Sequence, residues 1–432
     1  MYIGRAGREE IFEEFASFVS YGKVEIYRGL GFDFVPGRRE GCYIWDIEGR
    51  KRLLNCRSSG GVFNLGHRHP VTTEALRSAL NELDCGDHLL ISEQRAALAK
   101  RLAGLLPGDL TYTVFSVSGG EAIDLAIKLA RGHTGRAGVI SVSGGYHGTT
   151  GLATAAGDPK WKDKFGPMTP GFSQVPFGDL EALEPAVGED TAAVLLETYP
   201  ATGGVQVPPD GYFQGLREIC DRTGALWIDD EVQTGLGRTG TLWAVDEYGL
   251  TPDIMVLGKG MSGGIYPLSA TCISERLELF FRDDPFIHIS TGGGTELGCV
   301  VTMAMLDVIT APGFLEHVRA MGELLEEGLV QLGERHPDVQ AGFRRKGLMA
   351  GVDMVEEPMG LLLTMELYKN GVLALFADNN PRTMIIMPPL VAGEMEIGEV
   401  LEALERSYDG VRKSWNKAKA AMEGQEADGP DV

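Results

Sequence analysis

The sequence has few features of a nucleic-acid-binding, membrane-spanning or secreted protein. Basic residues are scarce: 39 Lys and Arg stand against 61 Asp and Glu, for a formal net charge of −22. This charge repels nucleic acid and anionic lipid, so we expect neither as a partner, although a locally positive pocket can still bind an anion. No apolar run reaches membrane-spanning length. The stretch MYIGRAGREEIFEEF has acidic residues where a signal peptide needs an apolar core.

Cysteine is also sparse. The six cysteines form no C-x-x-C pair and are scattered along the chain (Cys42, Cys56, Cys85, Cys220, Cys272 and Cys299). We therefore expect neither a disulfide framework nor a metal site, and we expect a reducing, cytoplasmic location. The rest of the composition, 44% hydrophobic and 23% charged over 432 residues, is typical of a globular protein with two or three domains, or with one large domain and an appendage.

The middle third of the chain alternates short apolar runs with helical patterns such as EAIDLAIKLAR and GYFQGLREICDRTG. The runs are TVFSV (113–117), GVISV (138–142), AAVLLE (192–197), ALWIDD (225–230), DIMVLGK (253–259) and LSATCIS (268–274). Strands that are joined by helical crossovers predict an α/β fold with a mostly parallel sheet covered by helices.

Both chain ends have a different pattern. GCYIWDIEGRKRLLN predicts a hairpin with its turn near Glu48 and Gly49, and FLEHVRAMGELLEEGLVQLGE predicts a long amphipathic helix followed by the strands GLMAGVDMV and RTMIIM. We assign residues 1–65 and 316–416 to a smaller α+β domain and residues 66–315 to a large domain. The polar tail, residues 417–432, is expected to be disordered.

Three polar residues, Glu197, Asp230 and Lys259, stand at the carboxyl ends of three predicted strands. Ligands bind outside this edge of an open α/β sheet, so the three side chains can converge on one site. Taken singly, a strand-end acid is more often a helix cap or a turn former. Lys259 is distinctive because glycine flanks it on both sides, which lets backbone and ligand approach closely.

Two glycine-rich loops add further ligand-binding features. In SVSGGEAIDL, Ser118, Gly119 and Gly120 precede a helix, whose free N–H groups can bind a phosphate; the alternative is that Ser118 only caps the helix. In SGGYHGTTG, Tyr146 and the adjacent His147 lie between glycines, and Tyr146 can stack on a planar ligand or pack on its own loop. A phosphate cup, a stacking aromatic, a carboxylate and a lysine together match the needs of pyridoxal 5'-phosphate.

Several motifs closely resemble the class III aminotransferases of the ω- and acetylornithine type, which have fold type I. They are LWIDDEVQTGLGRTG, WAVDEYGLTPDIMVLGKGMSGGIYPLSA, SGGEAIDLAIKLAR, GGYHGTT, NLGHRHP and STGGGTELGCVVTMAMLDVI, and they follow the family order over roughly residues 30–400. The resemblance implies a pyridoxal phosphate-dependent transferase. It also implies a large domain with a mostly parallel seven-stranded sheet and a smaller α+β domain built from both chain ends.

The resemblance also implies roles for single residues. Lys259 forms the Schiff base with the cofactor and moves the proton, Asp230 pairs with the pyridinium nitrogen, and Glu197 orders the acidic network. Val232 packs against the ring face opposite Tyr146, and Gln233 reaches the phenolic oxygen.

For the phosphate group, the resemblance implies binding by the backbone N–H groups of Gly119 and Gly120. Thr291 matches a threonine that reaches the phosphate from the second subunit, which implies a homodimer with shared active sites.

The sequence departs from the family pattern at several positions. Gly120 stands where threonine, serine or alanine is common, ETYPATGG contains Ala201 and Thr202 in place of the usual residues, and GGGTE replaces FGGNP at 292–296. Ile385 replaces an arginine that often binds the substrate carboxylate. Arg382 lies three residues earlier, on the opposite face of a strand, so Arg57 is the better candidate for that carboxylate, against the alternative that it is a surface arginine.

We therefore expect an aminotransferase that moves an amino group from a primary amine or amino acid to a 2-oxo acid through a Lys259 aldimine. Racemisation, decarboxylation, and β- or γ-elimination or replacement on the same scaffold remain alternatives, because the same cofactor residues would serve them. A catalytically silent cofactor-binding protein is a third possibility, against which Lys259, Asp230 and Tyr146 argue together. The sequence does not specify the donor or the acceptor.

Overall fold

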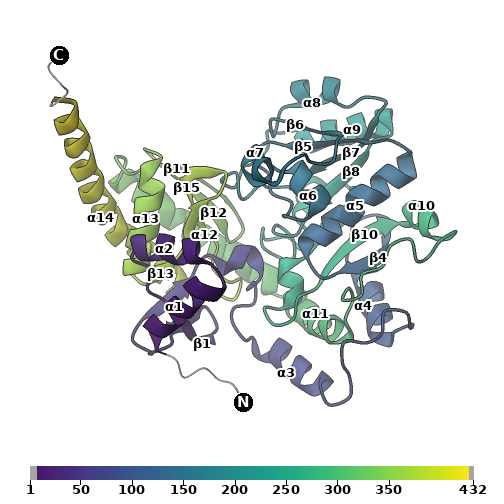
Figure 1. Ribbon diagram of the computed structural model, residues 1–432, viewed down its shortest axis with the longest axis horizontal. Coiled ribbons are helices and arrows are strands. Elements are labelled where there is room, and N and C mark those ends of the chain that lie inside the picture. The colour runs from purple at the N-terminus through teal and green to yellow at the C-terminus, as the bar shows by residue number, and fades with distance from the viewer. Residues whose placement is uncertain (1–6, 428–432) are drawn as a thin grey trace.

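The computed structural model describes the backbone of residues 7–427 and the side chains of residues 7–422. Figure 1 shows two lobes. The strands from β4 to β10 and their helices form one lobe, on the right of the view, and both chain ends contribute to the other.

A seven-stranded sheet forms the centre of the large lobe, in the order β4-β10-β9-β8-β7-β5-β6. The strands are β4 (Leu110–Ser116), β5 (Gly138–Val142), β6 (Phe172–Val175), β7 (Thr191–Leu196), β8 (Leu226–Asp230), β9 (Ile254–Leu257) and β10 (Ser269–Ser274). The pairs β5·β6, β5·β7, β7·β8 and β8·β9 are parallel, and β10 is antiparallel to β9 and β4. The expected mostly parallel sheet is confirmed.

Helices cover both faces of this sheet. They are α3 (Pro70–Ala79), α4 (Glu93–Ala103), α5 (Gly119–Thr134), α6 (Gly151–Ala156), α7 (Pro159–Lys162), α8 (Leu180–Ala186), α9 (Tyr212–Thr223), α10 (Glu275–Glu278) and α11 (Glu296–Ile309). In α5, the residues Ile123, Ile127 and Ala130 are buried at helical spacing against one face. Every residue of β7 and β8 is buried, as expected of strands with helices on both sides.

The smaller lobe contains two four-stranded sheets. One has the order β1-β2-β3-β13 and the other β11-β12-β15-β14. The strands are β1 (Pro36–Glu40), β2 (Tyr43–Asp46), β3 (Arg52–Asn55), β11 (Gln340–Lys346), β12 (Met349–Met354), β13 (Val372–Leu373), β14 (Leu375–Ala377) and β15 (Asn380–Ile386). The expected hairpin is β2–β3, with Tyr43 opposite Leu54. Leu54 also pairs in parallel with Val372, so one sheet joins both ends of the chain.

Five helices complete this lobe: α1 (Arg8–Phe18), α2 (Tyr21–Gly29), α12 (Phe314–Arg335), α13 (Pro358–Lys369) and α14 (Glu394–Ala427). The expectation of a disordered tail over 417–432 is wrong for residues 417–427, because α14 continues to Ala427 and projects from the lobe (Figure 1). The segment is rich in Ala, Lys, Glu and Met, which favour helix even without apolar packing. Residues 428–432 lie outside the described part of the chain.

Over residues 7–427, no single helix is both long and apolar enough to cross a membrane. The helices α11 and α12 reach that length and composition only when taken together, with a bend of 67° between them.

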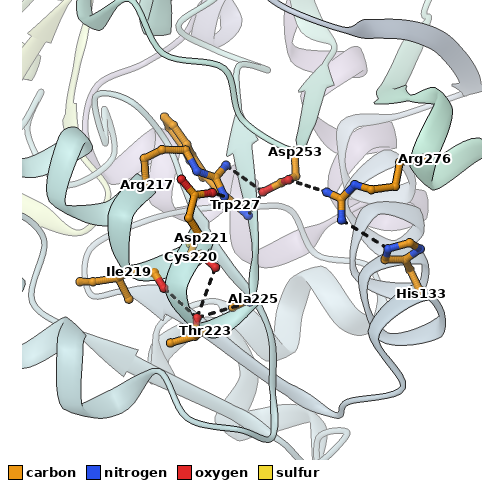
Figure 2. A network of polar contacts seen from close by, with 10 residues as sticks. All are labelled: His133, Arg217, Ile219, Cys220, Asp221, Thr223, Ala225, Trp227, Asp253 and Arg276. Carbon is orange, nitrogen blue, oxygen red and sulfur yellow. Dashed lines mark hydrogen bonds and ion pairs between the residues drawn. The ribbon is translucent and has the colours of Figure 1, made fainter.

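The amino-terminal edge of the large sheet is held by a charged network around Asp253, just before β9 (Figure 2). The Asp253 carboxylate accepts hydrogen bonds from Arg217 of α9 at 2.9 Å and from Arg276 of α10 at 2.8 Å. It also accepts one from the backbone N–H of Trp227 in β8 at 2.9 Å. One carboxylate thus joins two strands and two helices at the edge opposite the carboxyl ends of the strands.

Candidate active site

The carboxyl ends of β7, β8 and β9 lie side by side and bring together Glu197, Asp230 and Lys259. All three line one cavity of about 260 Å³. A second cavity of about 270 Å³ opens beside it and shares Tyr146, Gln233 and Lys259 with the first. The site therefore has an inner part at the sheet edge and an outer part that reaches the smaller lobe.

Lys259 stands where the two cavities meet. Its backbone has a φ of 41°, a left-handed conformation that is uncommon for a non-glycine residue and is typical of functional sites. Its Nζ donates a hydrogen bond to Oε1 of Gln233 at 2.5 Å. Burial lowers the pKa of Lys259 and the nearby Arg57 lowers it further, while Glu197 and Asp230 act in the opposite direction. The net lowering favours a neutral amine, which is the nucleophilic form.

The glycines on either side of Lys259 also leave room for other protein atoms. A Cβ on Gly258 would lie 3.0 Å from Oγ of Ser269, and a Cβ on Gly260 would lie 2.9 Å from Nδ2 of Asn64. A side chain at either position would therefore press against a neighbouring protein atom. Gly60, from the other lobe, is the glycine that faces the amine: a Cβ there would lie 3.3 Å from Nζ of Lys259.

Asp230 is buried and fixed at both carboxylate oxygens. Nδ1 of His147 lies 2.8 Å from Oδ2, and the N–H of Val232 donates to Oδ1 at 3.1 Å. The His147 side chain is fully buried, and its Nε2 has no hydrogen-bond partner among the described residues. These two contacts fix the orientation of the Asp230 carboxylate in the cavity.

Glu197 is buried, and its Oε2 has no hydrogen-bond partner among the described residues. Burial raises the pKa of Glu197 well above its usual range, the negative charge of Asp230 raises it further, and Lys259 opposes the shift. The raised pKa of Glu197 favours its neutral form.

The first turn of α5 forms one wall of the inner cavity through Ser118, Gly119 and Gly120. Ser118 also caps this helix, because its hydroxyl accepts a hydrogen bond from the N–H of Glu121 at 3.3 Å. A Cβ on Gly120 would lie 2.9 Å from Oγ1 of Thr150, so that hydroxyl occupies the space of a larger residue at 120. The N-terminus of α5 thus presents backbone N–H groups next to the hydroxyls of Ser118 and Thr150.

Tyr146 and Val232 both line the inner cavity, and Tyr146 also lines the outer one. Gly148, two residues after Tyr146, has a φ of 119°, and a Cβ there would lie 2.8 Å from Cα of Gly120. The glycine-rich loop therefore passes close to the start of α5, and only glycine fits at that position.

The outer cavity holds both residues that we expected near the substrate. Arg57 and Ile385 line it together with Asp378 and Trp161. Arg57 is exposed and, within the described part of the chain, its guanidinium has no carboxylate partner. Arg382 does not line either described cavity, and its Nε donates to the backbone oxygen of Met354.

Thr291 is the expected cofactor residue that this single chain does not bring to the site. It is exposed, and it lines neither of the two cavities.

Sequence reasoning missed several residues of the outer cavity. They include Trp161, Phe376 and Asp378. Thr202 also lines this cavity, although the sequence indicated it only as a departure from the family pattern. A signal was available for Asp378, because ADNNP has the composition of a turn between two apolar runs. No local pattern indicates Trp161, since it lies within the short helix α7 (Pro159–Lys162) rather than at the end of a strand.

The inner cavity fits pyridoxal phosphate by its own geometry. A helix N-terminus at Gly119, whose positive end favours anions, a buried carboxylate and an amine with lowered pKa lie in the same cavity. The unpartnered Glu197 Oε2 and His147 Nε2 indicate that polar groups there remain available for a ligand.

Comparison with known proteins agrees with this geometry. The family model described as aminotransferase class-III matches residues 29–407. An uncharacterized aminotransferase of Archaeoglobus fulgidus is 54% identical over 403 residues, which cover 93% of this chain and 95% of that protein. The ornithine aminotransferase of Toxoplasma gondii ME49 is 27% identical with a TM-score of 0.86, over 95% of this chain and 96% of that one. A PLP-bound amine transaminase from an uncultivated Pseudomonas species is 29% identical with a TM-score of 0.80, over 87% and 94%.

These relatives are all named for amino transfer, and they give no support to racemisation, decarboxylation, elimination or replacement. The fold type and the cofactor that the sequence motifs imply are confirmed as well. The chain belongs to the class-III aminotransferases and is a pyridoxal phosphate-dependent aminotransferase with the type I fold.

Proposed function

We propose that Lys259 is the residue that binds the cofactor and moves the proton during amino transfer. Pyridoxal phosphate, when bound, supplies a conjugated ring that accepts the electron pair released at the substrate carbon. The lowered pKa of Lys259 supports the role, because a neutral amine can both attack a carbonyl carbon and accept a proton. Gln233 holds the amine at 2.5 Å and so orients it within the cavity.

Asp230 keeps the ring nitrogen protonated in this proposal. The 2.8 Å contact between Nδ1 of His147 and Oδ2 of Asp230 supports it, because this contact fixes the orientation of the carboxylate within the cavity. Glu197 with its raised pKa would remain neutral and order the acidic groups without adding a competing negative charge.

We assign phosphate binding to the start of α5 and its neighbours. The backbone N–H groups of Gly119 and Gly120 lie at the positive end of a helix of 16 residues. Thr150 would supply the hydroxyl that Gly120 lacks, because its Oγ1 occupies the space beside that glycine. Tyr146 and Val232 would pack against the two faces of the ring.

Arg57 is the proposed binding residue for a substrate carboxylate. It lines the outer cavity, lies near enough to Lys259 to lower its pKa, and has no carboxylate partner among the described residues. Ile385 in the same cavity offers only apolar contact. The substrates would be a primary amine or amino acid as donor and a 2-oxo acid as acceptor, and Arg57 would hold the acid group.

A homodimer with shared sites is part of the proposal. Ile91 and Leu90 of one loop and Phe286 and Ile287 of another are exposed apolar residues, at 102%, 67%, 61% and 52% exposure. Arg95 of α4 connects the first loop with the segment that follows the second, because it donates to the backbone oxygens of Leu90 at 3.0 Å and Gly294 at 2.7 Å. Exposed large apolar side chains can mark a protein interface, and Thr291 lies four residues after Ile287 in sequence. The six free cysteines support a reducing, cytoplasmic compartment.

The observation that carries the proposal is the presence of Lys259, Asp230 and Tyr146 around one cavity. The test is to incubate the pyridoxal phosphate-loaded protein with a panel of amines and amino acids and to measure pyridoxamine phosphate and the oxo product. Lys259→Ala should abolish both, and the matched control Lys128→Ala, at an exposed position of α5, should not. Normal turnover by Lys259→Ala would sink the assignment.

A further inference from the structure

The loop that carries Tyr146 and His147 contains little that would fix its own shape. Gly144, Gly145 and Gly148 surround the two side chains, and Gly144 and Gly148 have φ values of 83° and 119°. Glycine has the greatest backbone freedom of any residue, so such a loop needs restraint from outside.

Part of the restraint comes from within the large lobe. Both carboxylate oxygens of Asp158 accept from the N–H of Gly144 at 3.1 Å, and the Thr202 hydroxyl donates to the Gly144 oxygen at 3.1 Å. These bonds hold the first glycine of the loop. They leave the backbone oxygen of Gly145, immediately before Tyr146, to another partner.

That partner is Asn379, which belongs to the other lobe. Its Nδ2 donates to the backbone oxygens of Gly144 at 2.9 Å and Gly145 at 3.2 Å. Its own backbone N–H donates to the oxygen of Thr202 at 2.9 Å. Asn379 lies in the two-residue turn between β14 and β15, since Ala377 pairs with Asn380.

The same side chain also fixes Trp161. The indole Nε1 donates to Oδ1 of Asn379 at 3.1 Å, so both ends of the Asn379 amide are used. The Trp161 ring meets the Tyr146 ring edge-on, with 5.2 Å between centroids and 66° between planes. Asn379 therefore holds Tyr146 in two ways, through the backbone before it and through the ring beside it.

The turn itself is anchored. The backbone oxygen of Asp378 accepts from Nζ of Lys160 in α7. Asn380, which follows Asn379 and begins β15, reaches the oxygen of Gly203 only at 3.5 Å, the outer limit of a hydrogen bond. Two adjacent asparagines, one in the turn and one at the start of β15, thus differ sharply in their contacts with the large lobe, which makes Asn380 a matched control.

We infer that Asn379 is a positioning residue of the active site: through the 144–145 backbone and Trp161 it sets the place of Tyr146 and, one residue on, of His147. This inference rests on the proposed roles of Tyr146 at the cofactor ring and of His147 at Asp230. The smaller lobe would thereby control the geometry of the cofactor site without touching the cofactor.

The first test measures the loop itself, in cofactor-free protein, by amide hydrogen exchange. Asn379→Ala should speed exchange in a peptide spanning residues 143–150 by about 10-fold, as expected for the loss of two hydrogen bonds to one loop. Asn379→Asp keeps the acceptor for Trp161 but loses the donor to the two carbonyl oxygens, so it should give a similar increase. Asn380→Ala should change nothing in that peptide. Unchanged exchange in both Asn379 variants would overturn the inference.

The second test measures pyridoxal phosphate binding, with Tyr146→Ala as a reference. We expect Tyr146→Ala and both Asn379 variants to weaken binding, the latter by about 5- to 30-fold, and Asn380→Ala to leave it unchanged. If Tyr146→Ala weakens binding and the Asn379 variants do not, the inference fails while the proposed function stands. If Tyr146→Ala itself has no effect, the proposed role of Tyr146 fails, and the exchange data alone decide whether Asn379 restrains the loop.

Discussion

Asp229, Asp230 and Glu231 are consecutive acids with three different environments. Asp230 faces the inner cavity and contacts His147, while Asp229 lies on the other side of β8 and accepts a hydrogen bond from the Thr198 hydroxyl at 3.0 Å. Burial raises the pKa of Asp229 well above its usual range, and Glu231 raises it further. One residue of displacement along a strand therefore separates a proposed cofactor partner from a buried, neutral structural acid.

Glu231 should make the stability of the protein depend on pH. Burial raises its pKa from about 4.5 to about 7, although its bonds from Thr234 and Val245 oppose the shift. The folded state thus favours the protonated form, so this contribution is fully present below about pH 4.5 and is lost as pH rises to about 7. Relative to Glu231→Gln, the free energy of unfolding of the wild type should fall by about 3 kcal/mol across that range.

Urea titrations of the cofactor-free proteins at several pH values measure this difference. Glutamine can keep both contacts, accepting from Val245 and donating to Thr234, so the variant should fold. Parallel pH curves for wild type and variant would contradict the prediction.

Arg57→Ala should weaken the binding of substrates that carry a carboxylate beside the reacting carbon. A hydrogen bond to a charged group is worth about 1.5–3 kcal/mol, so KM for these substrates should rise by about 10- to 100-fold. Simple amines should keep their KM. Arg382→Ala is the control, because that exposed arginine lies on the same strand as Ile385 but outside both described cavities.

The reciprocal change places a cation at position 385, which lines the same outer cavity as Arg57. Ile385→Arg should favour carboxylate-bearing substrates over simple amines, since a guanidinium replaces an apolar side chain in the outer cavity. If Ile385→Arg and Arg57→Ala both leave the kinetics of every substrate unchanged, the carboxylate site lies elsewhere.

At the scale of elements, the sequence predicted most of the central sheet because its strands are apolar on both faces. β7 and β8 are fully buried and were visible as continuous apolar runs. β6 was missed because it is an edge strand of four residues, FSQV, with only Val175 buried. The turn that holds Asn379 could not be assigned to the site, since its contacts are with loops far away in sequence.

Asp253 should stabilise the amino-terminal edge of the sheet without affecting catalysis. Its side chain is 13% exposed and binds two arginines and the Trp227 N–H, so Asp253→Asn should lower the free energy of unfolding by about 2 kcal/mol (Figure 2). The kcat should stay near wild type, because the network lies opposite the cavities.

A urea titration of each variant checks this expectation. The control is Arg222→Ala, which removes an ion pair to Glu184 whose side chains are 58% and 61% exposed. Exposed pairs contribute about 0–1 kcal/mol, so this variant should differ little from wild type. An equal loss of stability in the two variants would count against a special role for Asp253.

At the scale of the whole molecule, the family motifs identified the cofactor and the fold, while Thr291, a proposed cofactor residue, lines neither described cavity of the single chain. Thr291 is exposed, and a sequence motif alone does not tell which subunit a residue serves. The tail was misjudged for a related reason: polar composition argued for disorder, while the helix propensity of its residues extends α14 to Ala427.

Mixing two inactive variants tests for a shared site. Thr291→Glu should impair cofactor binding by placing a carboxylate near the phosphate, and Lys259→Ala should be inactive. If Thr291 serves the partner's site, each mixed dimer contains one intact site, and an equal mixture should recover about a quarter of wild-type activity. Activity that stays at the level of the separate variants would show that each site is built within one chain.

The pairing of β3 with β13 has a consequence for how the chain matures. Leu54 is made early and its parallel partner Val372 late, so at a synthesis rate of roughly 5–20 residues per second β3 waits roughly 15–60 s for its neighbour. During that interval the strand has an open hydrogen-bonding edge, and Leu53 and Leu54 lack the later-made members of the apolar clusters that bury them in the finished protein, such as Tyr368 and Val372. The nascent chain is therefore most prone to aggregation, and most dependent on chaperones, until Val372 has emerged from the ribosome.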